Sequence, residues 1–151
     1  MTIRVKGSIL VNAPVEKLWM LATNPMLSPR WNANIVEIRD FSGLPIGVGS
    51  TWVQVLKILG KNTEMRAVVT ECQAPESGTV QFYGPGDPRV TTDITEEGGG
   101  SRLTQTMDIV EVGGLMGFAL RVARSTIEHD LNEALRRQKV AAEETLDEKE
   151  A

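Results

Sequence analysis

The fold is decided by the stretch Ser101-Arg-Leu-Thr-Gln-Thr-Met-Asp-Ile-Val-Glu111 and by the long pattern that follows Gly113-Gly114. Every second residue of the stretch faces one side, and that face carries Leu103, Gln105, Met107 and Ile109. This alternation predicts a strand with one apolar face that contains a single amide. From Leu115 to about Glu144, apolar residues recur with the helical period, which predicts one long helix. A sheet with one apolar face needs a cover, and only this helix is long enough to provide it.

The rest of the chain is predicted to form six more strands and two short helices. The strands are expected at 2–11, 34–41, 50–58, 63–73, 79–83 and 90–95, separated by turns rich in Gly, Pro and Asn. Pro14 suits the first turn of one helix, and Asn24-Pro25 begins a shorter one. The sequence therefore predicts an α+β fold in which a curved, antiparallel, seven-stranded sheet wraps around a long C-terminal helix, with two short helices after strand one. We expect a single domain over 1–146 and a frayed acidic tail over 147–151.

Composition and charge limit the classes of function. The chain of 151 residues has a net charge of −4 with no concentrated basic face, which argues against nucleic acid as a partner. Its single cysteine, Cys72, excludes an intramolecular disulfide, and no cluster has metal-ligand spacing, so neither a metal nor another cofactor is expected. The N-terminus lacks the apolar core of a signal peptide, and no stretch is long enough to span a bilayer. We expect a cytoplasmic protein without stable membrane insertion, as a monomer or homodimer.

Several segments resemble a known superfamily. They are Asn12 to Trp19 (Asn-Ala-Pro-Val-Glu-Lys-Leu-Trp), Pro25 to Trp31, Gly47 to Trp52 (Gly-Val-Gly-Ser-Thr-Trp), Gly99 to Thr104 (Gly-Gly-Ser-Arg-Leu-Thr) and the closing helix. With this arrangement the chain resembles the START-related SRPBCC superfamily of polyketide cyclases/dehydrases, lipid-transfer domains and birch-pollen-allergen-like proteins. The resemblance covers nearly the whole chain and implies a helix-grip fold with a deep hydrophobic cavity. In that superfamily the cavity binds lipids, sterols, hormones, quinones or polyketides, and in a minority of members it is catalytic.

The candidate ligand-binding residues are those expected to face such a cavity. They are Trp31, Trp52, Gln54, Phe82, Thr92, Gln105, Met107, Met116, Ala123 and Ile127. Gln54, Thr92 and Gln105 are the polar members of otherwise apolar strand faces, so each either bonds to a neighbouring strand or waits for a ligand. The inward face of the strand at 50–58 stays open, because Val53 and Val55 on its other face are also apolar. Trp31 and Trp52 are large amphipathic rings suited to a cavity mouth.

The other candidates supply shape and adaptable apolar surface. Ala123 and Ala134 are small residues on the inward stripe of the last helix, where bulkier side chains would fill the space. Methionines suit an irregular ligand, and Leu115 to Phe118 are candidates for a lid. On strand five, Phe82 is expected inward and Tyr83 outward.

Three functions remain open from the sequence. The first is binding or transport of a hydrophobic small molecule that is a lipid, a quinone or a polyketide-like compound. The second is a polyketide aromatase/cyclase in which Gln105, Thr92 or Tyr83 orients enol or carbonyl oxygens. The third is a protein-interaction module that uses Arg121, Arg136 and Arg137. We favour the non-catalytic reading because His129, the one imidazole, is expected to face solvent, and Cys72 is expected to be a buried inert thiol.

Overall fold

The computed structural model describes residues 2–58, 60–110 and 114–150, apart from the side chains at 2, 116, 120 and 145–150. The elements are β1 (Thr2–Val11), α1 (Val15–Thr23), the 3₁₀ helix η1 (Pro25–Arg30), β2 (Ile35–Arg39), β3 (Thr51–Ile58), β4 (Lys61–Gln73), β5 (Ser77–Tyr83), β6 (Arg89–Glu97), β7 (Gly100–Val110), α2 (Gly114–Val122) and α3 (Arg124–Glu150). One strand, two short helices, six strands and a C-terminal helical region follow one another as the sequence predicts. The α+β fold class is confirmed.

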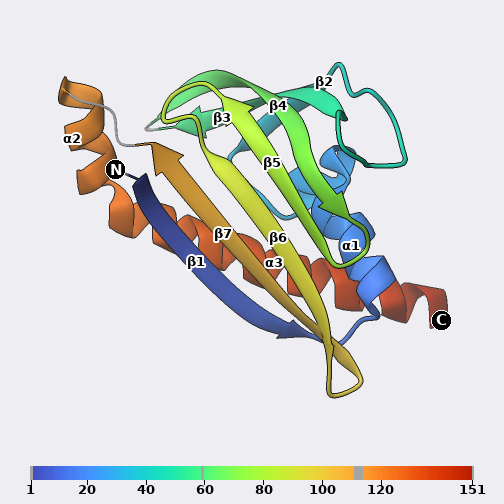
Figure 1. Ribbon diagram of the computed structural model, residues 1–151. Coiled ribbons are helices and arrows are strands. Elements are labelled where there is room, and N and C mark those ends of the chain that lie inside the picture. Colours follow the sequence, from blue (N-terminus) through green and yellow to red (C-terminus); the bar gives the residue numbers. More distant parts are fainter. Residues whose placement is uncertain (1, 59, 111–113, 151) are drawn as a thin grey trace.

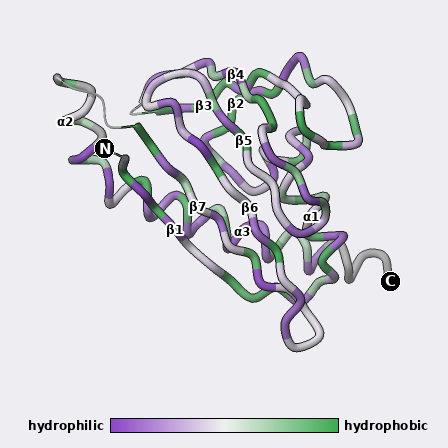
Figure 2. Tube along the Cα trace, viewed as in Figure 1, coloured by the Kyte–Doolittle hydropathy of each residue, from purple (hydrophilic) through white to green (hydrophobic). Residues whose placement is uncertain are grey.

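The strands form one antiparallel sheet in the order β1-β7-β6-β5-β4-β3-β2. Strands β2 to β7 are a meander, and β1 returns to pair with β7, so that Ile3 lies opposite Ile109 and Val11 opposite Ser101. The sheet remains open because β1 and β2 lie at its two edges. Along the strands the chain alternates between hydrophilic and hydrophobic residues (Figure 2), as expected for strands with one buried face.

Helix α3 lies across the apolar face of the bent sheet (Figure 1) and packs most closely on β1. A glycine makes this approach possible, because a Cβ atom at Gly7 would lie 2.6 Å from Cδ1 of Leu135 and 2.8 Å from Oδ1 of Asn132. Helix α1 covers another part of the same face, where the ring of Trp19 lies against Gly78 of β5. The helices therefore cover the β1 side of the sheet more closely than the β3 side.

Buried apolar side chains fall into two clusters. The larger cluster joins β1, β6 and β7 to α1 and α3 and includes Leu18, Leu103 and Leu135. The smaller cluster lies on β3, β4 and β5 and consists of Trp52, Met65, Ala67, Val69 and Phe82. Because α3 packs on the first cluster and not on the second, the bent sheet leaves a space between them.

The C-terminal helical region differs from the single helix that the sequence predicts. It bends at Ala123, so that α2 turns away from the axis of α3 (Figure 1). Backbone hydrogen bonds continue through the bend, from Ala123 N to Ala119 O and from Ile127 N to Ala123 O, both at 2.9 Å. Leu115, Phe118 and Val122 keep the helical apolar period but are 89, 66 and 68% exposed. At the other end α3 continues to Glu150, and the frayed tail over 147–151 stays a prediction.

No helix among the described residues is long and apolar enough to cross a membrane.

Candidate functional site

A cavity of about 290 Å³ occupies the space between the two apolar clusters. Strands β3 to β7 form its floor, α3 forms one wall, and α1 and η1 form another; most of the side chains that line it are apolar. Three of its lining residues, Lys57 at the end of β3 and Thr126 and Asp130 on α3, are exposed to solvent. We call the region of these three residues the mouth of the cavity.

Nine of the ten predicted ligand-binding residues line this cavity. They are Trp31, Trp52, Gln54, Phe82, Thr92, Gln105, Met107, Ala123 and Ile127. The side chain of Met116 lies outside the described part of the structure. Ala134, which the sequence analysis proposed as a space-leaving residue, also lines the cavity. The contact of these residues with a ligand stays a prediction.

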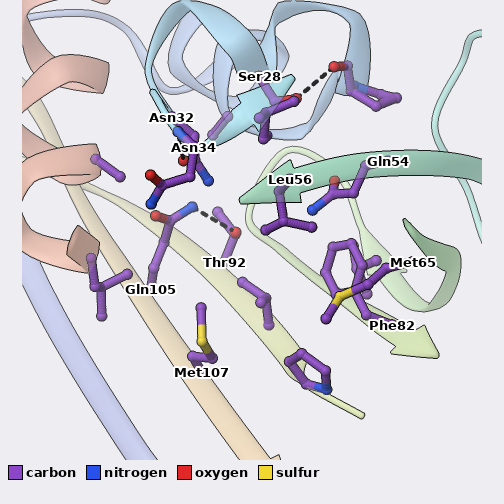
Figure 3. Close-up of a pocket in the computed structure, with 18 of the residues that line it drawn as sticks. Ser28, Asn32, Asn34, Gln54, Leu56, Met65, Phe82, Thr92, Gln105 and Met107 are labelled. Carbon is purple, nitrogen blue, oxygen red and sulfur yellow. Dashed lines mark hydrogen bonds between the residues drawn. The ribbon is translucent and has the colours of Figure 1, made fainter. Parts of the chain in front are cut away.

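Three buried polar side chains form a hydrogen-bonded relay from α3 to the cavity surface. Gln138 Nε2 donates to Gln105 Oε1 at 3.0 Å and to the carbonyl oxygen of Ala134 at 3.2 Å. Gln105 Nε2 donates in turn to Thr92 Oγ1 at 3.2 Å. Gln105 and Thr92 lie on facing positions of β7 and β6, and Figure 3 shows them side by side at the cavity wall. This relay is the polar centre of an otherwise apolar enclosure.

An aromatic cluster lines the region of β3 to β5. Trp52 packs edge-to-face against Phe82, with ring centroids 6.3 Å apart, and against Phe41 at 6.4 Å. The indole N–H of Trp52 donates to Gln54 Oε1 at 3.3 Å. Phe82 is buried whereas Tyr83 is 45% exposed, in agreement with the face predicted for each. These contacts hold Trp52 and Gln54 in fixed positions on the cavity surface.

Trp31 lies between η1 and β2 and is half-buried. Its indole N–H donates to the carbonyl oxygen of Leu21 at 3.0 Å, near the C-terminal end of α1, where backbone carbonyls lack helical partners. The ring thus links α1 to the segment that enters β2.

The titratable side chains that line the described cavity are few. Lys57 and Asp130 lie at the mouth, and Cys72 is half-buried, with Sγ 3.7 Å from the carbonyl oxygen of Ile46. His129 is exposed and does not line the cavity. Within the described ranges, no group of three or more His, Cys, Asp and Glu side chains is arranged to hold a metal ion. The interior is therefore suited to uncharged molecules.

The clearest perturbed ionisations lie outside the cavity. The hydrogen bond from Arg4 is the main cause that lowers the pKa of the Asp108 carboxyl. Burial opposes it, and the charges of Arg4 and Arg89 add to the lowering. Burial is the largest influence on Glu143 and acts to raise its pKa, but hydrogen bonds from Lys139 and the Asn12 N–H together lower it. Asp108 of β7 bonds to Arg4 of β1, and Glu143 of α3 bonds to Asn12 just after β1. Both carboxylates therefore have a structural role.

The interaction-module alternative gains no support from the arginines of α3. Arg136 and Arg137 both pair with Glu133 one turn away. Exposed ion pairs of this kind contribute little to stability, yet they reduce the free positive charge on this face.

Sequence reasoning missed two sets of polar residues. Gln138 lies on the predicted apolar stripe of α3, but its role as partner of Gln105 depends on a contact 33 positions away. Asn32 and Asn34 line the cavity from the loop before β2, where no periodic pattern assigns a direction. For Gln138, the sequence offered one signal. Its amide lies at an inward position of the helix, and the amide of Gln105 lies at an inward position of a strand.

The fold consists of a bent antiparallel sheet, a long helix across its apolar face and an apolar cavity between the two. This arrangement defines the helix-grip class. The family model described as "Polyketide cyclase / dehydrase and lipid transport" matches residues 2–143. The chain belongs to this family, which confirms the resemblance to the SRPBCC superfamily. The comparison with curated proteins gives no match.

Several solved structures share the fold. The Zhui aromatase/cyclase from Streptomyces sp. R1128 has a TM-score of 0.80 at 14% identity, with 97% of this chain and 96% of that chain covered. A protein from Thermus thermophilus, TTHA0849, has a TM-score of 0.79 at 16% identity, with 95% and 99% covered. Ara h 8.0201 has a TM-score of 0.64 at 11% identity, with 94% and 98% covered. At these identities the likeness is one of fold alone.

Proposed function

We propose that the protein binds a hydrophobic small molecule (a lipid, a quinone or a polyketide-like compound) in the cavity between the sheet and α3, and acts as its carrier or sensor. The single observation that supports this most strongly is the enclosed space of about 290 Å³ between two apolar clusters. Such a volume lies near the lower end of the range for small-molecule sites, which are mostly apolar with a few placed polar groups. Membership of a family that includes lipid transport is consistent with this role.

The charge distribution supports an uncharged ligand. The charged side chains among the described lining residues, Lys57 and Asp130, are exposed at the mouth, so the interior offers no counter-charge. A buried carboxylate or phosphate without a partner would lose several kcal/mol in desolvation, on the order of the penalty known for buried ions. The ligand's polar groups are therefore neutral ones.

A polyketide cyclase remains the second candidate, because Thr92 and Gln105 are hydrogen-bonding groups at the surface of the cavity, where an enol or carbonyl oxygen would lie. Such donors stabilise developing negative charge on oxygen. A cyclisation or dehydration also transfers protons, which calls for a well-placed acid or base. The described interior offers the thiol of Cys72 and no carboxylate or imidazole. The carrier proposal needs no such group and is preferred.

Equilibrium dialysis against fluorene, a neutral tricyclic hydrocarbon, tests the proposal directly. We expect saturable uptake of one fluorene per chain, quantified by chromatography at concentrations below its solubility. Unfolded protein in urea serves as the control for non-specific partition. Uptake that does not saturate, or that is equal in the native and unfolded protein, would contradict a ligand-binding cavity.

A further inference from the structure

We propose that Gln138 fixes the polar centre of the cavity as a pure hydrogen-bond donor, so that the site selects a ligand oxygen that only accepts, such as a ketone or ester carbonyl. This inference rests on the proposed function, because it concerns a ligand in the same cavity. It adds the roles of individual residues: Thr92 and Gln105 meet the ligand, and Gln138, behind them, is a positioning residue.

The orientation of Gln138 is set by the backbone. Its side-chain amide lies 3.2 Å from the carbonyl oxygen of Ala134, one turn earlier in α3. A backbone carbonyl can only accept, so the group that faces it must be the amide NH₂ and not the amide oxygen. The second hydrogen of the same nitrogen then points to Gln105, where it finds Oε1 at 3.0 Å.

The orientation of the Gln138 amide determines the orientation of Gln105 and of Thr92. Because Gln105 uses its oxygen to accept from Gln138, it must present its NH₂ to Thr92, at 3.2 Å from Oγ1. Thr92 Oγ1 accepts this bond and keeps its own hydroxyl proton, and within the described residues this proton has no other acceptor. Thr92 and Gln105 both line the cavity. The hydroxyl proton and the second Gln105 N–H are therefore left to a ligand oxygen.

The amide of Gln54 is also oriented so that its NH₂ group is a donor, through a contact that does not involve Gln138. The Trp52 indole N–H can only donate, so it holds the oxygen of Gln54, at 3.3 Å, and leaves the Gln54 NH₂ free. Gln54 is buried and lines the cavity, and Figure 3 shows its side chain extending towards Leu56 on the cavity side of β3. Two unrelated anchors, a carbonyl and an indole, thus make both glutamines that line the cavity, Gln54 and Gln105, donors.

The relay has a measurable cost. With both hydrogens of Gln138 Nε2 engaged, Gln138 Oε1 is fully buried and has no hydrogen-bond partner among the described residues. A buried acceptor left unpaired is destabilising, because it loses its hydrogen bonds to water and gains none in the protein. Turning the amide over would not relieve this cost, because Oε1 would then face the Ala134 carbonyl. The observed orientation is the less costly one, and it makes Thr92 a donor.

The consequence is selectivity between ligands of nearly equal size and shape. A carbonyl oxygen has two lone pairs and pairs with both free protons, whereas a hydrocarbon leaves them unpaired. A ligand hydroxyl can also accept these protons, but its own proton is then left without a partner, which makes it a poorer match than a carbonyl. Asn34 Oδ1 is an acceptor that lines the cavity, but its amide is bonded to exposed Asp130 at the mouth, within reach of water.

Equilibrium dialysis with fluorenone, fluorenol and fluorene tests the inference, because these three probes differ at one carbon. At a net value of about 0.5–1.5 kcal/mol per hydrogen bond, two bonds predict that fluorenone binds about 5–150-fold more tightly than fluorene. Fluorenol should fall between them. Equal affinities for all three, with saturable binding, would overturn the inference and leave the proposed function intact. Absence of saturable binding for every probe would overturn both.

Substitutions at Thr92 and Gln138 test which residues cause the preference for fluorenone. Thr92→Val should bring the fluorenone and fluorene affinities together, whereas Thr92→Ser, which keeps the hydroxyl, should preserve the preference.

Gln138→Met matches the size of glutamine and releases Gln105 to turn over. Thr92 can then donate to Gln105 Oε1, so the ratio of fluorenone to fluorenol affinity should fall several-fold while fluorene affinity stays unchanged. A purely structural role would lower all three affinities together. An unchanged ratio in folded Gln138→Met, or in Thr92→Val if Gln138→Met does not fold, would contradict the proposal.

Discussion

Asn34 Nδ2 donates a hydrogen bond to Asp130 Oδ2 at 3.2 Å, and this contact joins the segment before β2 to α3 at the mouth of the cavity. Asn34 is itself held by its backbone, since its N–H donates to Asn32 Oδ1 and its carbonyl accepts from Lys57. Three segments that border the mouth are therefore linked through one residue. A ligand that enters between α3 and β3 must pass this link.

Loss of the link should speed ligand exchange. We expect Asp130→Ala to increase the dissociation rate of fluorenone about 2–10-fold, as one exposed hydrogen bond of about 0.5–1.5 kcal/mol would allow. Asp130→Asn keeps an acceptor oxygen for Asn34 and is the matched control. Stopped-flow measurement of tryptophan fluorescence follows the release, because Trp52 lines the cavity. Identical rates in the wild type and both variants would place the route of entry elsewhere.

Two alanines on α3 should respond in opposite ways to the same enlargement. Ala134 borders the cavity, so Ala134→Leu should change the free energy of unfolding by less than about 1 kcal/mol and weaken fluorene binding at least tenfold. Ala142 lies in the larger apolar cluster and is 1% exposed, so Ala142→Leu should destabilise the protein by about 1–3 kcal/mol through overpacking. Urea unfolding and equilibrium dialysis give both quantities. Equal destabilisation by the two substitutions would mean that the space beside Ala134 is filled.

A methyl group at Gly7 should separate α3 from β1. The new Cβ would lie 2.6 Å from Cδ1 of Leu135, whose side chain is buried and cannot move away freely. We expect Gly7→Ala to reduce the free energy of unfolding by about 1–3 kcal/mol. Gly47 is the control, because a Cβ there meets nothing within 4 Å and its φ is not in the left-handed region. Gly47→Ala should change stability by less than about 1 kcal/mol, and an equal loss in both variants would contradict the close packing at Gly7.

The Arg4–Asp108 pair should make stability depend on pH in the acid range. Arg4 Nε donates to Asp108 Oδ1 at 2.7 Å, and this bond lowers the pKa of the Asp108 carboxyl in the folded protein. Because the unfolded state then binds the proton more readily, the contribution to stability is present above about pH 4 and is lost as pH falls through the folded pKa. Urea unfolding at pH 7 and pH 3 should show a smaller pH-dependent loss in Asp108→Asn than in the wild type.

Arg4→Met provides the reciprocal variant. It removes the main cause of the lowered pKa while the Asp108 carboxyl remains, so most of the same pH-dependent loss should disappear. An undiminished loss in both variants would show that other carboxylates govern acid unfolding.

The strands could be predicted from local pattern, and so could the inward face of those with a clear alternation, whereas the inward faces of the second to fifth strands stayed open. Residues 101–110 have a buried face because side chains alternate along a strand, and this period needs no knowledge of the partner strands. The choice of Phe82 over Tyr83 followed from the same alternation. The bend at Ala123 could not be predicted, because the apolar period continues into α2 although the sheet below it does not.

The candidate site could be predicted from the sequence only in part. Gln105, Thr92 and Gln54 could be chosen because polar residues interrupt apolar faces. Neither the choice of Gln138 as the partner of Gln105 nor the link from Asn34 to Asp130 follows from the sequence, since the residues of each pair lie 33 and 96 positions apart. Hydrogen-bond partners at such separations depend on how α3 crosses the sheet.

The sequence by itself determined the order of elements, the meander and the inward face of the clearly alternating strands, because these follow from periods of two and 3.6 residues along the chain. Only the tertiary structure decided where α3 touches the sheet, and therefore where the cavity lies and which way its amides point. The physical reason is that the space between two elements, and the hydrogen bonds across it, depend on both facing surfaces. At Gly7, for example, the absence of a side chain lets α3 approach β1 closely.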